Sequence, residues 1–341
     1  MIRDTGPSLG LLSRCATEGH YGERNEKPLC MKHLWGGSAA MKPYYWMTDF
    51  TPQEEWIDQQ GIFLLLAFFF TEIGAGLYGV SLFLGFWRGC LAGWLISCVL
   101  GGGFHLLYLG KPLRAWRAVL KPRTSELSRG MVFMILFAGM GALHIAPSLS
   151  FLGFLPWQSD ILLFKIVMAV LCFFVITHGF MIMNVITGIP FWNSAILPVL
   201  ALASGVWLGT QLGTAVSFSL SEAEILTSME PVARWFLFVY IFLSLFFLWN
   251  SAHSSSAAQA SLRMLVKGDL APLFYGGVVL IGFVIPLIIT FYFWANSSVL
   301  PSYGLASVRV ICAFLGDLTL RYVISKSGRY APLIYSNLVQ G

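Results

Sequence analysis

From residue 61 onward, one apolar run follows another, and each run is about as long as a bilayer is thick. A helix needs about 20 apolar residues to cross the hydrocarbon layer. The runs predict eight transmembrane helices, over residues 61–86, 89–109, 130–153, 160–185, 194–217, 234–252, 274–296 and 303–324. Because 57% of the residues are hydrophobic and only 11% are charged, the composition excludes an ordinary soluble domain and a disordered chain.

The chain divides into three parts by composition and order. Residues 1–60 form a polar leader that lacks the apolar core of a secretory signal peptide, and part of it is expected to be disordered. Residues 61–193 hold the first four spans, which can form one four-helix bundle. Residues 194–341 hold the other four spans and a C-terminal tail. The Cys and His residues of the leader match no compact zinc-finger spacing, so no metal site is expected.

Basic residues gather on one side of the predicted membrane. An even number of spans puts both chain ends on that side, which we call the N-side. The leader, the loops at 110–129 and 253–273 and the C-terminal part hold all of the 21 Lys and Arg residues except Arg88, Lys165, Arg234 and Arg309. The opposite side has an acidic loop at 218–233. The positive-inside rule therefore predicts a multi-pass protein of the cell (inner) membrane with cytoplasmic termini.

Ionisable side chains inside the predicted spans are candidates for function, because they are costly in a bilayer. They are Glu72, His105, His144, His178, Arg309, Asp317 and Arg321. His105 and His178 lie at similar depth, near the N-side ends of their spans, and Glu72 lies near the middle of the first span. We expect these three side chains to share the interior of one bundle. His144 lies near the opposite face and is expected to be structural.

Two imidazoles near a membrane interface suit a quinone head group. The quinone carbonyls accept hydrogen bonds and take up protons on reduction, and histidine can donate a bond and exchange a proton near neutral pH. The quinone tail needs an apolar groove, which Phe68, Phe69 and Phe70 could line. Two alternatives stay open: each histidine could bond a neighbouring helix, or both could bind a b-type haem, although no spacing requires haem.

The loop at 110–129 is strongly basic. It holds one acidic residue, Glu126, against Lys111, Arg114, Arg117, Lys121, Arg123 and Arg129. The simple interpretation is a topology signal. The alternative is a docking surface for an acidic subunit beside the quinone site, and in either case Trp116 would anchor the loop at the interface.

In the last span, Asp317 and Arg321 are four residues apart, which places them on one face of a helix. The two can neutralise each other as a structural ion pair that fixes helix packing. They can equally be one station of a proton path with Asn250 and His253. The spacing does not separate these two hypotheses.

Several segments of the chain resemble a known family. They are TEIGAG at 71–76, residues 104–130 with the element LGKPLRAW, residues 178–209 with the element PFWNS, and residues 316–333, which begin GDLTLRY. In these segments the chain is similar to the NrfD-like membrane subunits of polysulfide reductase type and to the related dimethyl sulfoxide reductase anchors. The order and spacing of the segments make the likeness specific, and it covers most of residues 60–335.

The resemblance implies two four-helix bundles and no cofactor held tightly within this subunit. It implies that menaquinone or ubiquinone reacts as a substrate in the first bundle, with His105 and His178 at the quinone site. Electrons would pass between the quinone and a four-cluster iron–sulfur subunit, which serves a catalytic subunit with a molybdenum or tungsten pterin. Polysulfide reductase has polar quinone ligands near positions that are apolar here, Leu64 and Ala67, and Glu72 lies one turn deeper.

Three functional hypotheses follow. The first is a quinone-reactive anchor that has no turnover alone, in which His105, His178 and Glu72 serve the quinone and the basic loop seats the iron–sulfur subunit. The second is a secondary transporter or an ion- or proton-translocating protein, and the third is a b-type cytochrome subunit. No nucleic-acid partner is expected. In the better-known relatives the N-side faces the periplasm, whereas the charge count favours the cytoplasm.

Overall fold

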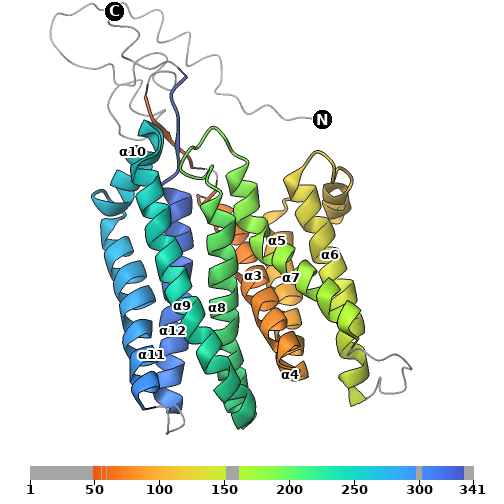
Figure 1. Ribbon diagram of the computed structural model, residues 1–341. Helices are drawn as coiled ribbons and strands as arrows, with labels where there is room; N and C mark the ends of the chain where they lie inside the picture. The colour runs from red at the N-terminus through yellow and green to blue at the C-terminus, as the bar shows by residue number, and fades with distance from the viewer. Residues whose placement is uncertain (1–48, 55, 59, 151–160, 297–301, 334–341) are drawn as a thin grey trace, which may run out of the picture. The chain divides into compact units, whose positions relative to one another are not determined.

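The computed structural model describes residues 49–54, 56–58, 60–150, 161–296 and 302–333, and residues Phe50–Pro332 form one compact unit. In the described part of this unit, eight helices are long and apolar enough to span a membrane, as predicted. Figure 1 shows them side by side. They are α3 (Gly61–Phe83), the second span (Trp87–Tyr108), the third (Glu126–Ser148), α7 (Leu162–Asn184), α8 (Ile196–Ser219), α9 (Ala223–Ala252), the seventh (Leu273–Ala295) and α12 (Tyr303–Lys326).

Three of the spans are composite. The second runs from α4 (Trp87–Leu95) through the π-helix η2 (Ile96–Gly101) into α5 (Gly102–Tyr108). The third is α6 (Glu126–Ile145) with the short 3-10 helix η4 (Ala146–Ser148), and the seventh joins the π-helix η6 (Leu273–Val284) to α11 (Ile285–Ala295). A π-helical turn changes the register of the residues that follow it, so the faces of α5 and α11 do not continue those of the preceding segments.

The prediction for the sixth span is wrong at its start. Helix α9 begins at Ala223, so the acidic loop predicted at 218–233 is mostly helix. Its acidic residues suggested a loop, yet the segment is helical and the helix continues through Pro231. Glu230 on α9 accepts two hydrogen bonds from Arg309 of α12, at 2.9 and 2.5 Å, and this pairing offsets the cost of burying both charges.

Basic residues that were predicted to lie away from the N-side also contact other side chains. Arg88 forms an ion pair with Glu222 at 2.8 Å. The guanidinium of Arg234 lies over the ring of Trp294, 4.8 Å from its centroid. The charge of Arg88 is therefore matched at the opposite end of the helices, and Arg234 is held there against an aromatic ring.

The centre of the unit is the contact between α3 and α8. Helix α3 packs against α4, α5, α7 and α8, and also touches α12. A side chain at Gly76 would collide with the backbone of Gly205 on α8, and one at Gly74 would collide with Gly93 of α4. Small residues let helix backbones approach closely inside a membrane. The two halves of the chain are thus in direct contact, and their division into two four-helix bundles stays a prediction.

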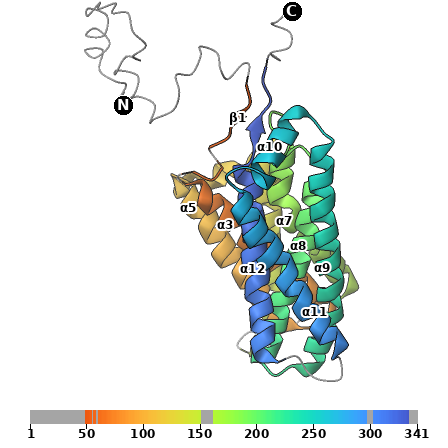
Figure 2. The same ribbon diagram turned by 90° about the vertical axis from the view of Figure 1, so that its left-hand side faces the viewer.

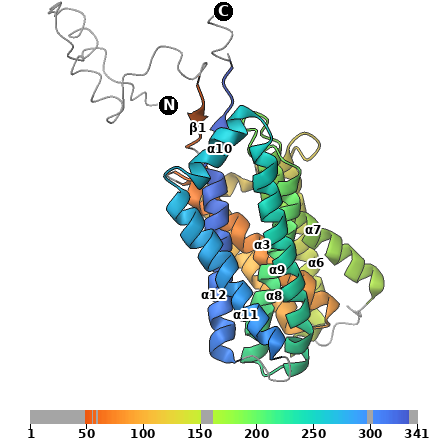
Figure 3. The ribbon, with the colours of Figure 1, turned by 60° about the vertical axis from the view of Figure 1, so that its left-hand side comes forward.

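The connections on the N-side form a small cap. Here lie the 3-10 helix η3 (Pro112–Val119), helix α10 (Ser256–Val266) and the antiparallel strands β1 (Thr51–Pro52) and β2 (Arg329–Tyr330). Figures 1 and 2 show α10 and the strand β1 at the same end of the helices. Helices α11 and α12 lie on one flank and α6 and α7 on the other (Figure 3).

The link between α7 and α8 is fixed to the end of α12. The indole nitrogen of the fully buried Trp192 donates a hydrogen bond to the carbonyl oxygen of Ile324, at 2.9 Å. The ring of Trp56 contacts the Trp192 ring edge-on, with centroids 5.2 Å apart. The tryptophan of the PFWNS element therefore joins segments that are far apart in the sequence.

Candidate functional site

Glu72 lies at the middle of the molecule because of the small residues that follow it on α3. Gly74 and Gly76 bring α3 against α4 and α8, so the preceding side chain has no route to the lipid. Glu72 is only 1% exposed. The TEIGAG segment therefore builds a close helix crossing and buries one carboxylate at it.

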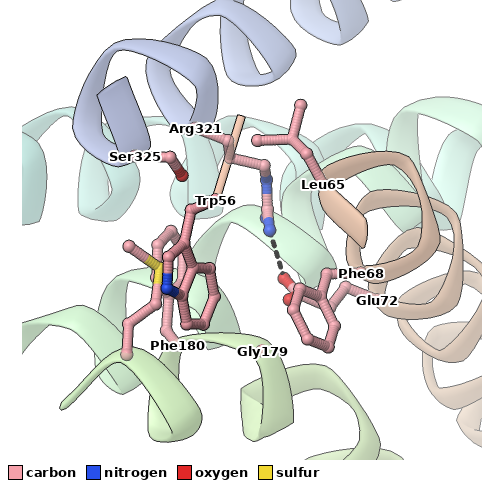
Figure 4. A pocket seen from close by; sticks show the side chains of 9 residues that line it. Trp56, Leu65, Phe68, Glu72, Gly179, Phe180, Arg321 and Ser325 are labelled. Atoms are coloured by element: carbon pink, nitrogen blue, oxygen red, sulfur yellow. Dashed lines mark hydrogen bonds and ion pairs between the residues drawn. The ribbon is translucent and has the colours of Figure 1, made fainter. Parts of the chain in front are cut away.

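Arg321 of α12 reaches this carboxylate. Its Nη1 donates to Glu72 Oε2 at 2.6 Å (Figure 4), and its Nε donates to Asp317 Oδ2 at 2.5 Å. The predicted contact between Asp317 and Arg321 is confirmed, and it extends to a third ionisable group. Two carboxylates share one guanidinium, so the cluster is neutral only when it also holds a proton.

Two further side chains complete this cluster, and the sequence analysis missed both. The hydroxyl of Ser204 on α8 accepts a hydrogen bond from Arg321 Nη2 at 2.6 Å, and the hydroxyl of Tyr240 on α9 donates to Asp317 Oδ1 at 2.8 Å. Serine and tyrosine are common in apolar helices, so nothing in the sequence set these two apart. The cluster therefore joins α3, α8, α9 and α12.

The two predicted histidines meet at one aromatic ring of α3. The Phe68 ring contacts His105 of α5 edge-on at 5.4 Å and His178 of α7 edge-on at 5.6 Å, between centroids. The structure thus brings both imidazoles to the residue one turn before Glu72. In each histidine Nε2 is buried and has no hydrogen-bond partner among the described residues, and the same holds for Oε1 of Glu72.

The hydrogen bond of His105 defines its free nitrogen. Its Nδ1 lies 2.9 Å from the carbonyl oxygen of Gly101, the last residue of η2. A carbonyl oxygen only accepts, so the proton sits on Nδ1 and the neutral ring presents Nε2 as an acceptor. The π-helical segment η2 directly precedes this turn, and such segments are often found at functional sites.

The position of His178 depends on a glycine of α6. A side chain at Gly130 would overlap the His178 imidazole, so the ring fits only against a bare helix backbone. A side chain at the next residue, Gly179, would collide with Phe68 and approach Glu72 Oε1 within 2.8 Å. The two glycines therefore leave room for the imidazole against α6 and for Phe68 and Glu72 against α7.

The spaces beside Glu72 and His178 differ greatly in size. The cavity lined by Glu72, Phe68 and Arg321 has a volume of about 20 Å³, which holds a single water molecule (Figure 4). A groove of about 380 Å³ reaches His178 between α6 and α7. Ligand pockets usually measure about 300–1,000 Å³, so the groove can take an organic head group and the cavity at Glu72 cannot.

The other predicted residues lie away from this centre. His144 accepts or donates a hydrogen bond with the Tyr78 hydroxyl at 2.7 Å, the interhelical contact expected of a structural histidine. His253 is exposed, and its ring bonds the carbonyl oxygen of Trp249, one turn before it. The residue that bonds Asp317 is instead Tyr240 of α9. The basic side chains of the predicted docking surface are exposed: Lys111, Arg114, Arg117, Lys121 and Arg123.

Among the described residues, no group of three or more His, Cys, Asp or Glu side chains could hold a metal ion. The Cys and His residues of the leader lie outside the described residues. Comparison of the sequence with protein-family models and with curated proteins finds no match.

Proposed function

We propose that this chain is the quinone-reactive membrane anchor of a respiratory molybdopterin oxidoreductase complex. The observation that carries the proposal is the set of buried polar atoms on His105, His178 and Glu72 that have no partner among the described residues, on side chains grouped about Phe68. Buried polar groups are normally paired, so several unpaired ones in one region favour a ligand. The resemblance to polysulfide reductase anchors supports the same interpretation.

The chemistry of a quinol fits these atoms. Oxidation of a quinol to a quinone releases electrons and protons together, so the site needs acceptors for its hydroxyl protons. His178 lines the groove that can take the head group, so it can bond the quinol directly. Nε2 of His105 and Oε1 of Glu72, which have no partner among the described residues, are further acceptors on the other side of Phe68. Arg321 holds the other oxygen of Glu72 and can stabilise the carboxylate after a proton leaves.

The electrons would pass to partner subunits outside the membrane. The exposed cations of the basic loop lie at the same end of the helices as His105 and His178. They form the docking surface of the proposal, for a four-cluster iron–sulfur subunit beside a molybdenum or tungsten pterin protein. Menaquinone or ubiquinone would be the membrane substrate, and this chain alone would have no turnover.

The test is reduction of the partner's iron–sulfur clusters by added quinol in the purified complex, followed by electron paramagnetic resonance. This readout needs no knowledge of the terminal substrate. We expect His105→Gln and His178→Gln to abolish it, while dithionite still reduces the clusters. His144→Gln, at a half-buried histidine bound to Tyr78, serves as the matched control and should retain quinol-dependent reduction.

The comparison requires that each variant still assembles into the complex. Gel filtration of each variant establishes this. Normal quinol-dependent reduction in both histidine variants would remove the assigned site. A visible absorption spectrum of the same preparation tests the b-type cytochrome alternative, because a haem band that disappears in either variant would identify the histidines as haem ligands.

Proton translocation is a second candidate, favoured by the cluster in which two carboxylates share Arg321. In lipid vesicles that contain the complex and a pH-sensitive dye, quinol turnover would then move protons across the membrane. Asp317→Asn should stop this movement while electron transfer continues. Equal proton movement in the variant would leave the cluster with a structural role.

A further inference from the structure

Helix α7 carries an open groove beside His178. The groove has a volume of about 380 Å³ and runs between α6 and α7, with Pro198 of α8 at its side. Its walls include the rings of Phe133 and Phe174, which stack with centroids 4.2 Å apart and planes 4° from parallel. An aromatic wall of this kind favours a flat ring in the groove.

The polar groups of the groove indicate a neutral head group. At its mouth, Arg129 forms an ion pair with Glu126 at 2.5 Å and donates to the carbonyl of Pro122 at 2.9 Å. The charges there are thus already matched. His178, which is 4% exposed, also lines the groove, and its Nε2 has no partner among the described residues. A carbonyl or hydroxyl of an uncharged ring would satisfy it.

A second groove adjoins the first toward the other end of α7. It has a volume of about 650 Å³, is mainly apolar, and shares Phe174 with the groove at His178. Leu162, Ile166, Val170, Phe174 and His178 follow one another at four-residue spacing, which makes one stripe on the helix. From His178 to Leu162 the stripe is about 24 Å long, at about 1.5 Å per residue.

We propose that this stripe of α7 binds a long-tailed quinone, with the ring at His178 against the stacked pair of Phe133 and Phe174 and the isoprenoid tail along Val170 and Ile166 toward Leu162. The inference rests on the proposed function and assigns the ring to the α6–α7 side. His105 and Glu72 then act from behind Phe68, because the cavity of about 20 Å³ at Glu72 admits no ring.

The test places a bulky side chain at the lipid-exposed rim of each groove in the assembled complex. Val185→Trp blocks the mouth of the groove at His178, where Val185 is 51% exposed, and Val170→Trp, at a 48% exposed position, blocks the tail groove. Val199→Trp is the matched control, since Val199 is 50% exposed and does not line either groove. Rates of cluster reduction are measured with a long-tailed quinol and with a tail-less analogue.

We expect Val185→Trp to raise the KM for both quinols by about tenfold. Val170→Trp should raise the KM for the long-tailed quinol only, and Val199→Trp should leave both values unchanged. The inference is overturned when both groove variants behave like Val199→Trp. It is also overturned when only Leu107→Trp, at a 61% exposed position on α5, raises the KM. If no quinol reduces the clusters of the native complex, the proposed function itself fails.

Discussion

At the scale of single residues, Arg321 has the largest energetic role in the buried polar cluster. It is 4% exposed and contacts Glu72, Asp317 and Ser204. Burying an ion pair is not strongly favourable in itself, because both charges lose their hydration. Removing the cation alone, however, leaves buried carboxylates without a counter-charge, which is the costly change.

Arg321→Gln should therefore lower the free energy of unfolding by about 3–5 kcal/mol. Arg263→Gln, at an exposed position on α10, is the matched control and should change it by less than about 0.5 kcal/mol. Adding Glu72→Gln and Asp317→Asn to Arg321→Gln should restore part of the loss. The measurement is thermal unfolding in detergent, and an unchanged midpoint for Arg321→Gln would contradict the account.

The sequence indicated part of this cluster. Ionisable residues stand out inside apolar runs, so Glu72, Asp317 and Arg321 could be named, and the four-residue spacing of the last two fixed their contact. The bond between Glu72 and Arg321 could not be predicted, because it joins the first and last spans. Which distant helices meet depends on packing between whole surfaces, and one sequence does not encode that in a local pattern.

At the scale of helices, glycine decides which elements touch. The α3–α8 crossing has backbone atoms where a side chain at Gly76 would lie. Helix existence was predictable, because length and composition suffice for apolar spans. The start of α9 was not predictable, because a helix can tolerate a proline such as Pro231. The π-helices η2 and η6 were not predictable either, because a one-residue change in hydrogen bonding has no compositional signal.

Gly76→Ala should destabilise the protein by about 1–3 kcal/mol, because its new methyl group meets the Gly205 carbonyl. Gly139→Ala is the matched control, since this α6 glycine has open space around it. That change should be neutral or should stabilise the protein by up to about 1 kcal/mol through helix propensity. Unfolding in detergent mixtures compares the two variants, and equal midpoints would contradict the proposed crossing.

The basic loop, which includes the helix η3, is the proposed docking surface for the iron–sulfur subunit. Arg114→Glu with Arg117→Glu should weaken the association of the iron–sulfur subunit by about tenfold and reduce its dependence on salt. Arg263→Glu, an exposed change at the same end of the molecule, should have a much smaller effect. Binding would be measured by retention of the partner during purification at several salt concentrations, and equal retention in both variants would leave the loop as a topology signal.

At the scale of the whole molecule, the eight candidate spans and their even number put residues 253–255 on the N-side and 220–222 on the other. The basic loops predict that the N-side is cytoplasmic. In a cysteine-free background, an impermeant maleimide should label Ser221→Cys in intact cells and Ser254→Cys only after permeabilisation. The reverse pattern would place the N-side outside.

The central claim is that this chain anchors a quinone-dependent oxidoreductase. The most direct measurement is purification from the native membrane in mild detergent, with co-purifying chains identified by mass spectrometry and metals by elemental analysis. The account predicts an iron–sulfur subunit together with a protein that contains molybdenum or tungsten. A chain that purifies alone and without these metals would contradict it and would favour a transporter.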